Sequence, residues 1–117
     1  MGNLCDMKNS IVLVPFPFDD FTNSKIRPAL CLTNEIGNYQ HIIIAFISSN
    51  LDSNLLDTDF LISTNSKSKT GLKVDSIIKL HKIVTIPKSF IKRKLGTLAS
   101  EDINIINQKI VQLFELK

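Results

Sequence analysis

The sequence predicts a mainly β (α+β) domain, a small twisted antiparallel barrel capped by a C-terminal α-helix. Its length of 117 residues is enough for one hydrophobic core but not for two, so 1–117 is expected to be a single domain. Short runs of β-branched residues alternate with polar turns through most of the chain. Only the final segment spaces its apolar residues by three and four, as an amphipathic helix does.

The first half of the chain is expected to form an antiparallel meander after a loose leader at residues 1–9. Its strands are continuous apolar runs, expected at residues 11–16, 29–33 and 41–48. Residues 17–27 are expected to be a polar loop. Residues 34–38 contain asparagines and a glycine that tolerate positive φ, which favours a turn.

The second half is expected to add shorter strands before the helix. They are expected at residues 59–63, 76–80 and 83–86, with 95–98 as a further strand or an extended link. Residues 49–56 suit either a loop or a short helical turn. Residues 65–71 are the most polar part of the chain, which predicts a mobile basic loop.

The C-terminal helix has the clearest signals for where it begins and which side it buries. Ser100 suits the N-cap, and acidic residues follow it in the first turn, where the helix dipole favours anions. One face of the helix is apolar, formed by Ile103, Ile106, Ile110, Leu113 and Phe114.

The composition argues against membrane and secreted classes. No apolar run approaches the roughly 20 residues of a membrane helix, and the N-terminus lacks a signal-peptide pattern. Cys5 and Cys31 lie far apart, and Cys31 is expected to be a buried thiol, so a reducing cytoplasm is the expected setting. No metal-type spacing and no glycine-rich phosphate loop occur, so neither a metal nor another cofactor is expected.

Charge is distributed unevenly along the chain, although the net charge is only +3. Residues 1–60 carry a net charge of −4, whereas residues 61–117 carry +7. Most of the excess lies between Lys67 and Lys94, where nine basic residues face a single acid, Asp75. Such a basic region is typical of proteins that bind polyanions, although a solvated lysine-rich surface has the same composition.

The most distinctive local feature is Arg27, one of only two arginines, which directly precedes Pro28. Proline disfavours the helical conformation of the residue before it, so Arg27 is expected to be extended. A guanidinium held in this way can grip two oxygens of a phosphate. The alternative is an arginine paired with Asp19 or Asp20 of the same loop.

Taken together, these segments make the chain resemble the MazF/PemK (Kid) family of type II toxin–antitoxin toxins. The resemblance covers roughly residues 9–115, and its most specific part is the Lys-Ile-Arg-Pro-Ala-Leu-Cys-Leu-Thr segment at 25–33. The other matching segments are residues 11–18, 43–50, 71–80, 82–86 and 94–98.

The resemblance implies an SH3-like barrel, a homodimer and a metal-independent endoribonuclease that cuts single-stranded RNA at short sequences. It also implies a cognate antitoxin protein whose disordered tail covers the active groove. Operator DNA is a further expected partner, bound through the antitoxin complex. A membrane partner is not expected.

The resemblance also assigns candidate site residues. The family's loop arginine falls on Arg27, and the catalytic serine or threonine after the third strand falls on Ser48. Kid-like members carry an Arg-x-Asp pair in a later strand, where this chain has Lys79-Leu-His81. Imidazole titrates near neutral pH, so His81 is the candidate for proton transfer, although a histidine flanked by lysines also suits a solvated surface. Candidate RNA-binding residues are Phe18, Lys25, Lys67, Lys69 and Lys79.

Two other functions fit parts of the sequence. A non-cleaving toxin like the CcdB gyrase poisons would act through the terminal helix, around residues 108–117, and would not need Arg27. A DNA- or RNA-binding relic without catalysis would use the lysine-rich segment 67–94.

Overall fold

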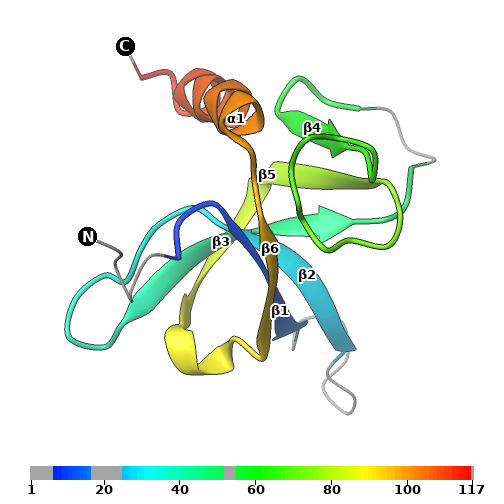
Figure 1. Cartoon of the computed structure of the whole chain (residues 1–117). Helices are drawn as coiled ribbons and strands as arrows, with labels where there is room; N and C mark the ends of the chain where they lie inside the picture. Colours follow the sequence, from blue (N-terminus) through cyan, green and yellow to red (C-terminus); the bar gives the residue numbers. More distant parts are fainter. Residues whose placement is uncertain (1–6, 17–24, 52–54, 117) are drawn as a thin grey trace.

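The computed structural model of the chain describes residues 7–16, 25–51 and 55–116. Its strands form one antiparallel sheet in the order β4-β5-β3-β2-β1-β6. The elements are β1 (Ser10–Phe16), β2 (Lys25–Cys31), β3 (His41–Ser48), β4 (Asp59–Ile62), β5 (Ser76–Pro87), the 3-10 helix η1 (Lys88–Phe90), β6 (Arg93–Thr97) and α1 (Ser100–Leu113). Figure 1 shows the sheet strongly curled, with β6 leading into α1. The predicted fold class is confirmed.

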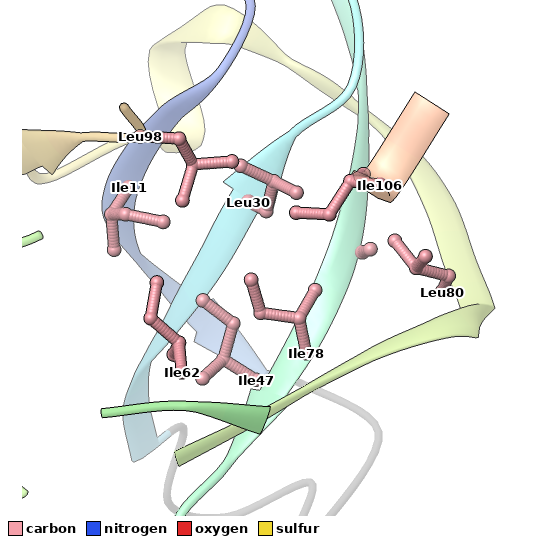
Figure 2. Packing of buried hydrophobic residues seen from close by; sticks show 9 residues of the cluster. Ile11, Leu30, Ile47, Ile62, Ile78, Leu80, Leu98 and Ile106 are labelled. Carbon is pink, nitrogen blue, oxygen red and sulfur yellow. The ribbon is translucent and has the colours of Figure 1, made fainter. Parts of the chain in front are cut away.

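Both faces of the curled sheet bury apolar side chains, as the continuous apolar runs predict. One face forms a helix-side core with α1, and Figure 2 shows Ile106 of the helix reaching toward Leu30 of the sheet. The opposite face carries a second core that includes Val12, Ala29 and Ile44. Successive residues of β1 therefore enter different cores, Ile11 the first and Val12 the second.

Strand β5 is a single long strand, so the prediction of separate strands at 76–80 and 83–86 is wrong. Its register against β3 jumps, because Ala45 pairs with Ile83 while Phe46 pairs with Lys79. Residues 80–82 of β5 therefore face no residue of β3 and form a bulge. A bulge bends its strand and increases its twist, so β5 can curl with the sheet and still pair along both halves.

The basic loop at 65–71 is packed, not mobile as predicted. Lys69 forms a bridge with Thr97 of β6, and the Thr97 N–H donates to the Lys69 carbonyl oxygen at 2.9 Å. The loop thus connects the region between β4 and β5 to β6, the strand at the other edge of the sheet. Gly96 permits this contact, since a Cβ there would lie 1.9 Å from the Lys69 carbonyl oxygen.

The same loop, and not Ser100, supplies the hydroxyl at the start of α1. The N-cap is Ala99, one residue before the predicted Ser100. Its backbone N–H donates to Ser68 Oγ at 2.7 Å, and Ser68 Oγ donates in turn to Asp102 Oδ2 at 2.5 Å. A serine distant in sequence therefore accepts from the N–H of the N-cap residue and binds the Asp102 side chain in the first turn, so it stabilises the helix start in place of Ser100.

Replacing Ser68 with alanine is expected to lower the free energy of unfolding by about 1–2 kcal/mol, the usual effect of losing a helix cap. The matched variant Ser100→Ala is expected to change it by less than about 0.5 kcal/mol, as exposed positions usually do. Urea denaturation of both variants measures the difference. Equal losses in the two variants would contradict the assignment of the cap to Ser68.

Several other boundaries differ from the prediction. Strand β2 begins at Lys25, so Arg27 lies within a strand and not in a loop. Residues 7–9 are held in place, because the N–H groups of Met7 and Lys8 both donate to Asn34 Oδ1. The predicted leader is thus not loose there, and its first six residues lie outside the described residues. Residues 52–54 of the segment predicted as ambiguous also lie outside them.

Cys31 is buried, as predicted, in the second core. Burial raises the pKa of its thiol from 9.0 to about 12, although Lys94 nearby lowers it slightly. The thiol therefore stays protonated at neutral pH and is unreactive. In the part of the chain that the structure describes, no helix is long and apolar enough to cross a membrane.

Candidate functional site

The site begins where strands β2 and β3 stop pairing. Their register joins Cys31 to Ile44, Leu30 to Ala45 and Ala29 to Phe46, and goes no further. In an antiparallel ladder, every second pair of opposite residues is hydrogen-bonded. The Leu32 N–H donates to the Ile43 carbonyl oxygen, so the next hydrogen-bonded pair is Leu30 with Ala45. The pair that would continue this series contains Pro28, which has no N–H to donate. Proline thus ends the ladder just before Arg27.

Arg27 and Ser48 lie on the same face of the sheet, on neighbouring strands. Continuing the β2–β3 register by two residues brings Arg27 opposite Ser48, beyond the last paired residues Ala29 and Phe46. On its other side Arg27 pairs with Val14 of β1, which fixes its backbone in an extended strand. The arginine is half-buried.

Ser48 is the last residue of β3 and is also half-buried. Its Oγ accepts a hydrogen bond from the Asn50 N–H at 3.1 Å. That bond uses a lone pair of the hydroxyl and leaves the O–H proton for donation to another group. Across the sheet Ser48 pairs with Ile77 of β5, so the strand end is held from that side.

Lys79 and His81 lie further along the same face, where β5 bends. Lys79 pairs with Phe46 on one side and with Asp59 of β4 on the other. Lys79 Nζ lies 3.7 Å from Asp59 Oδ2, and His81 Nδ1 lies 3.7 Å from Asp59 Oδ1. The Asp59 side chain is only 1% exposed, against 17% for Lys79 and 32% for His81.

Asp59 forms a cluster with Lys79 and His81, but it was not among the candidate residues predicted from the sequence. It stands in a short strand with another acid close by, and its partners follow 20 and 22 residues later in the chain. Only the pairing of β4 with β5 brings them together, so no local spacing indicates the cluster.

The structure groups some of the candidate residues and separates others. Arg27, Ser48, Lys79 and His81 share one face, and Lys25 precedes Arg27 on the same face of β2. Lys67 lies elsewhere, 3.4 Å from Glu101 in the first turn of α1, and Lys69 bridges to β6. Candidate Phe18 and the alternative partners Asp19 and Asp20 lie outside the described residues.

No group of three or more histidine, cysteine or acidic side chains that could hold a metal ion occurs within residues 7–16, 25–51 and 55–116. The Asp59 cluster contains one acid, one histidine and one lysine. Lysine as a cation would repel a metal ion placed beside that carboxylate. The arrangement instead suits binding of an anionic group and proton transfer.

Comparison with known proteins gives a consistent result. A family model described as "PemK-like, MazF-like toxin of type II toxin-antitoxin system" matches residues 7–114. A curated relative, "Endoribonuclease MazF" of Staphylococcus saprophyticus subsp. saprophyticus, is 32% identical over 87 residues, which are 73% of this chain and 70% of the relative.

Solved structures share the fold at lower identity. "Mycobacterium tuberculosis toxin MazF-mt6" superposes with a TM-score of 0.72 at 22% identity, covering 92% of this chain and 98% of the other. An "Endoribonuclease in complex with its cognate antitoxin from Mycobacterial species" also gives a TM-score of 0.72, at 13% identity, covering 95% and 96%. MazF from Deinococcus radiodurans gives 0.67 at 14% identity, covering 97% and 99%.

Proposed function

Because this chain belongs to the PemK-like, MazF-like toxins of type II toxin–antitoxin systems, we propose that it cleaves single-stranded RNA without a metal ion. The chain is an endoribonuclease toxin of this family. Arg27, Ser48 and His81 are the residues that we assign to its chemistry. The observation that carries the assignment is the β2–β3 register, which ends at Ala29 and Phe46. Continued by two residues past Pro28, this register puts Arg27 opposite Ser48.

The reaction uses the 2′-hydroxyl of the RNA as its nucleophile. The 2′ oxygen forms a bond to the adjacent phosphorus, and the bond from phosphorus to the 5′ oxygen of the next nucleotide breaks. The products are a 2′,3′-cyclic phosphate and a free 5′-hydroxyl. One proton leaves the 2′ oxygen and another reaches the departing 5′ oxygen, so the enzyme needs a base, an acid and stabilisation of the charged phosphorane.

Each assigned residue suits one of these tasks. The guanidinium of Arg27 stabilises the negative charge that develops on the phosphate oxygens. The Ser48 O–H donates to a phosphate oxygen or positions the 2′-hydroxyl, and it is not the base, since no described neighbour is a base that activates it. His81 removes the 2′ proton as the general base. The departing 5′ oxygen takes its proton from solvent water, so no side chain is assigned as the acid.

Incubation of the purified protein with a long defined RNA in EDTA tests this function. Cleavage at a short sequence is expected, with cyclic phosphate and 5′-hydroxyl ends identified by mass spectrometry. An otherwise identical RNA with a 2′-deoxy nucleotide at the cut position is expected to resist, because it lacks the nucleophile. Cleavage of the deoxy substrate, or ends with a 5′-phosphate, would contradict the proposed mechanism.

The proposed function also implies binding partners and a location in the cell. An antitoxin partner is supported by the toxin–antitoxin family and by the solved complex of a similar fold. Its expected binding surface is the face that carries Arg27. Self-association into a homodimer is supported by apolar residues that α1 and its C-terminal end leave exposed, among them Ile105, Val111 and Phe114. Operator DNA, reached through the antitoxin complex, and a cytoplasmic location where RNA is available complete the proposed setting.

A further inference from the structure

We propose that Asp59 is a positioning residue for RNA cleavage, which orients His81 and Lys79 for the reaction. This inference rests on the proposed function, since it concerns the residue assigned to proton transfer. It adds an acid from β4 to a site otherwise built from β2, β3 and β5. Asp59 does not touch the substrate in this proposal, because its side chain is almost wholly buried.

The Asp59 carboxylate is fixed in place by its own turn. Its backbone N–H donates to the Leu56 carbonyl oxygen at 3.0 Å, and its Oδ2 accepts from the Leu56 N–H at 3.0 Å. These reciprocal bonds hold both the backbone and the side chain of the residue. Pairing of Asp59 with Lys79 then sets which face of the sheet the carboxylate occupies.

The second carboxylate oxygen is buried and has no hydrogen-bond partner among the described residues. Asp59 Oδ1 faces His81 Nδ1 at 3.7 Å, which is ion-pair range but too long for a hydrogen bond. A buried carboxylate oxygen without a donor is unfavourable, so it favours any donor brought close to it. Catalytic hydrogen bonds are often long without substrate and shorten when substrate binds.

This geometry selects one tautomer of His81. A carboxylate facing Nδ1 favours the form that carries its proton there, which leaves Nε2 unprotonated to accept the 2′ proton of the RNA. The Asp59 carboxylate, which faces Nδ1, stabilises the imidazolium that results. Lys79 beside Oδ2 supplies the opposite charge that a buried carboxylate requires.

The substitution Asp59→Asn isolates this role. The amide oxygen of asparagine can still accept from the Leu56 N–H, which keeps the turn. Its NH₂ group then faces His81 and donates to Nδ1, which forces the histidine proton onto Nε2, the wrong nitrogen for a base. The value of kcat for RNA cleavage is expected to fall about 10²-fold, the lower end of what a positioned acid–base residue contributes. KM is expected to stay within about two-fold, because Asp59 makes no contact with RNA.

A matched control uses another carboxylate that pairs with a lysine. Glu35 Oε2 lies 2.7 Å from Lys88 Nζ. The next residue, Ile36, bridges to His41, which is at the opposite end of β3 from Ser48. Glu35→Gln is expected to leave kcat unchanged. The pair of variants therefore separates loss of a particular carboxylate from loss of any ion pair.

Coupling to His81 distinguishes positioning from a structural role. In a His81→Ala background, adding Asp59→Asn is expected to cause no further loss of kcat, because the residue that Asp59 orients is already absent. Losses that multiply would overturn the proposal. So would an Asp59→Asn variant with wild-type kcat.

A spectroscopic measurement tests the proposal without relying on activity. Nitrogen-15 NMR of the full chain is expected to show His81 with its proton on Nδ1, and on Nε2 after Asp59→Asn. His41, the only other histidine, serves as the internal control and should not change. An unchanged His81 tautomer refutes the Asp59 role even if the wild type cuts RNA. A wild type that shows the tautomer switch but cuts no RNA refutes instead the proposed function, and with it the catalytic use of the cluster.

Discussion

Arg27→Ala is expected to lower kcat for RNA cleavage about 10²–10³-fold, equivalent to about 2.7–4 kcal/mol of transition-state stabilisation. The effect is large because a preorganised cation acts where charge develops on the phosphate, in a site that the fold has already arranged. Single-turnover cleavage of a short RNA that contains the mapped cut site measures it. KM should rise less than kcat falls, since the charge on phosphorus is greatest in the transition state.

The other arginine provides the control. Arg93 is exposed on β6 and pairs with Leu13, so it is not part of the site that contains Arg27 and Ser48. Arg93→Ala is therefore expected to retain near-wild-type kcat. Arg27→Lys keeps the charge but loses the planar fork, and should fall between the wild type and Arg27→Ala. Thermal melting of each variant shows whether folding is intact. Full activity in a folded Arg27→Ala protein would remove Arg27 from the mechanism.

Ile106→Ala is expected to produce the largest loss of stability, about 2–5 kcal/mol in the free energy of unfolding. Ile106 is 1% exposed and lies in the helix-side core, where it contributes the one fully buried side chain of α1. Figure 2 shows it among side chains of the sheet, so the shortened alanine leaves a cavity there. Urea denaturation, monitored by circular dichroism, measures the change.

The neighbouring residue makes the comparison specific. Ile105 is 42% exposed on the same helix, and Ile105→Ala is expected to change stability by less than about 1 kcal/mol. Both substitutions have the same effect on side-chain size, so a difference between them reports burial alone. Similar losses at both positions would indicate that α1 does not pack against the sheet as described, or that Ile105 is buried in a homodimer.

Local patterns predicted most of the elements because local chemistry decides them. Strand His41–Ser48 has the predicted bounds, since an uninterrupted apolar run admits one interpretation. The helix begins within one residue of the prediction, because its apolar residues recur at intervals of three and four and acidic residues occupy its first turn. Errors occurred where distant partners intervene. Strand β5 continues through the bulge at 80–82 because β3 pairs with it on both sides of the bulge, and the loop at 65–71 is ordered by β6 and α1.

The residues of the candidate site also differ in whether they could be predicted without the tertiary structure. Arg27 is marked by the proline that follows it, whereas Ser48 was assigned only through the resemblance to the toxin family. Asp59 has no such mark, because a carboxylate becomes significant only when burial and two cationic or titratable neighbours surround it.

The amino-acid sequence by itself determined the mainly β class, the helix with most of its inward face, and the extended arginine before Pro28, since backbone sterics and side-chain periodicity act between near neighbours. Phe114, which was also predicted on that face, is 52% exposed just past the end of the helix. Only the tertiary structure decided which strands pair, where the β2–β3 ladder ends, and that an acid from the edge strand β4 meets His81. Those outcomes depend on register and on the curl of the sheet, and both arise from packing among residues that are far apart in the chain.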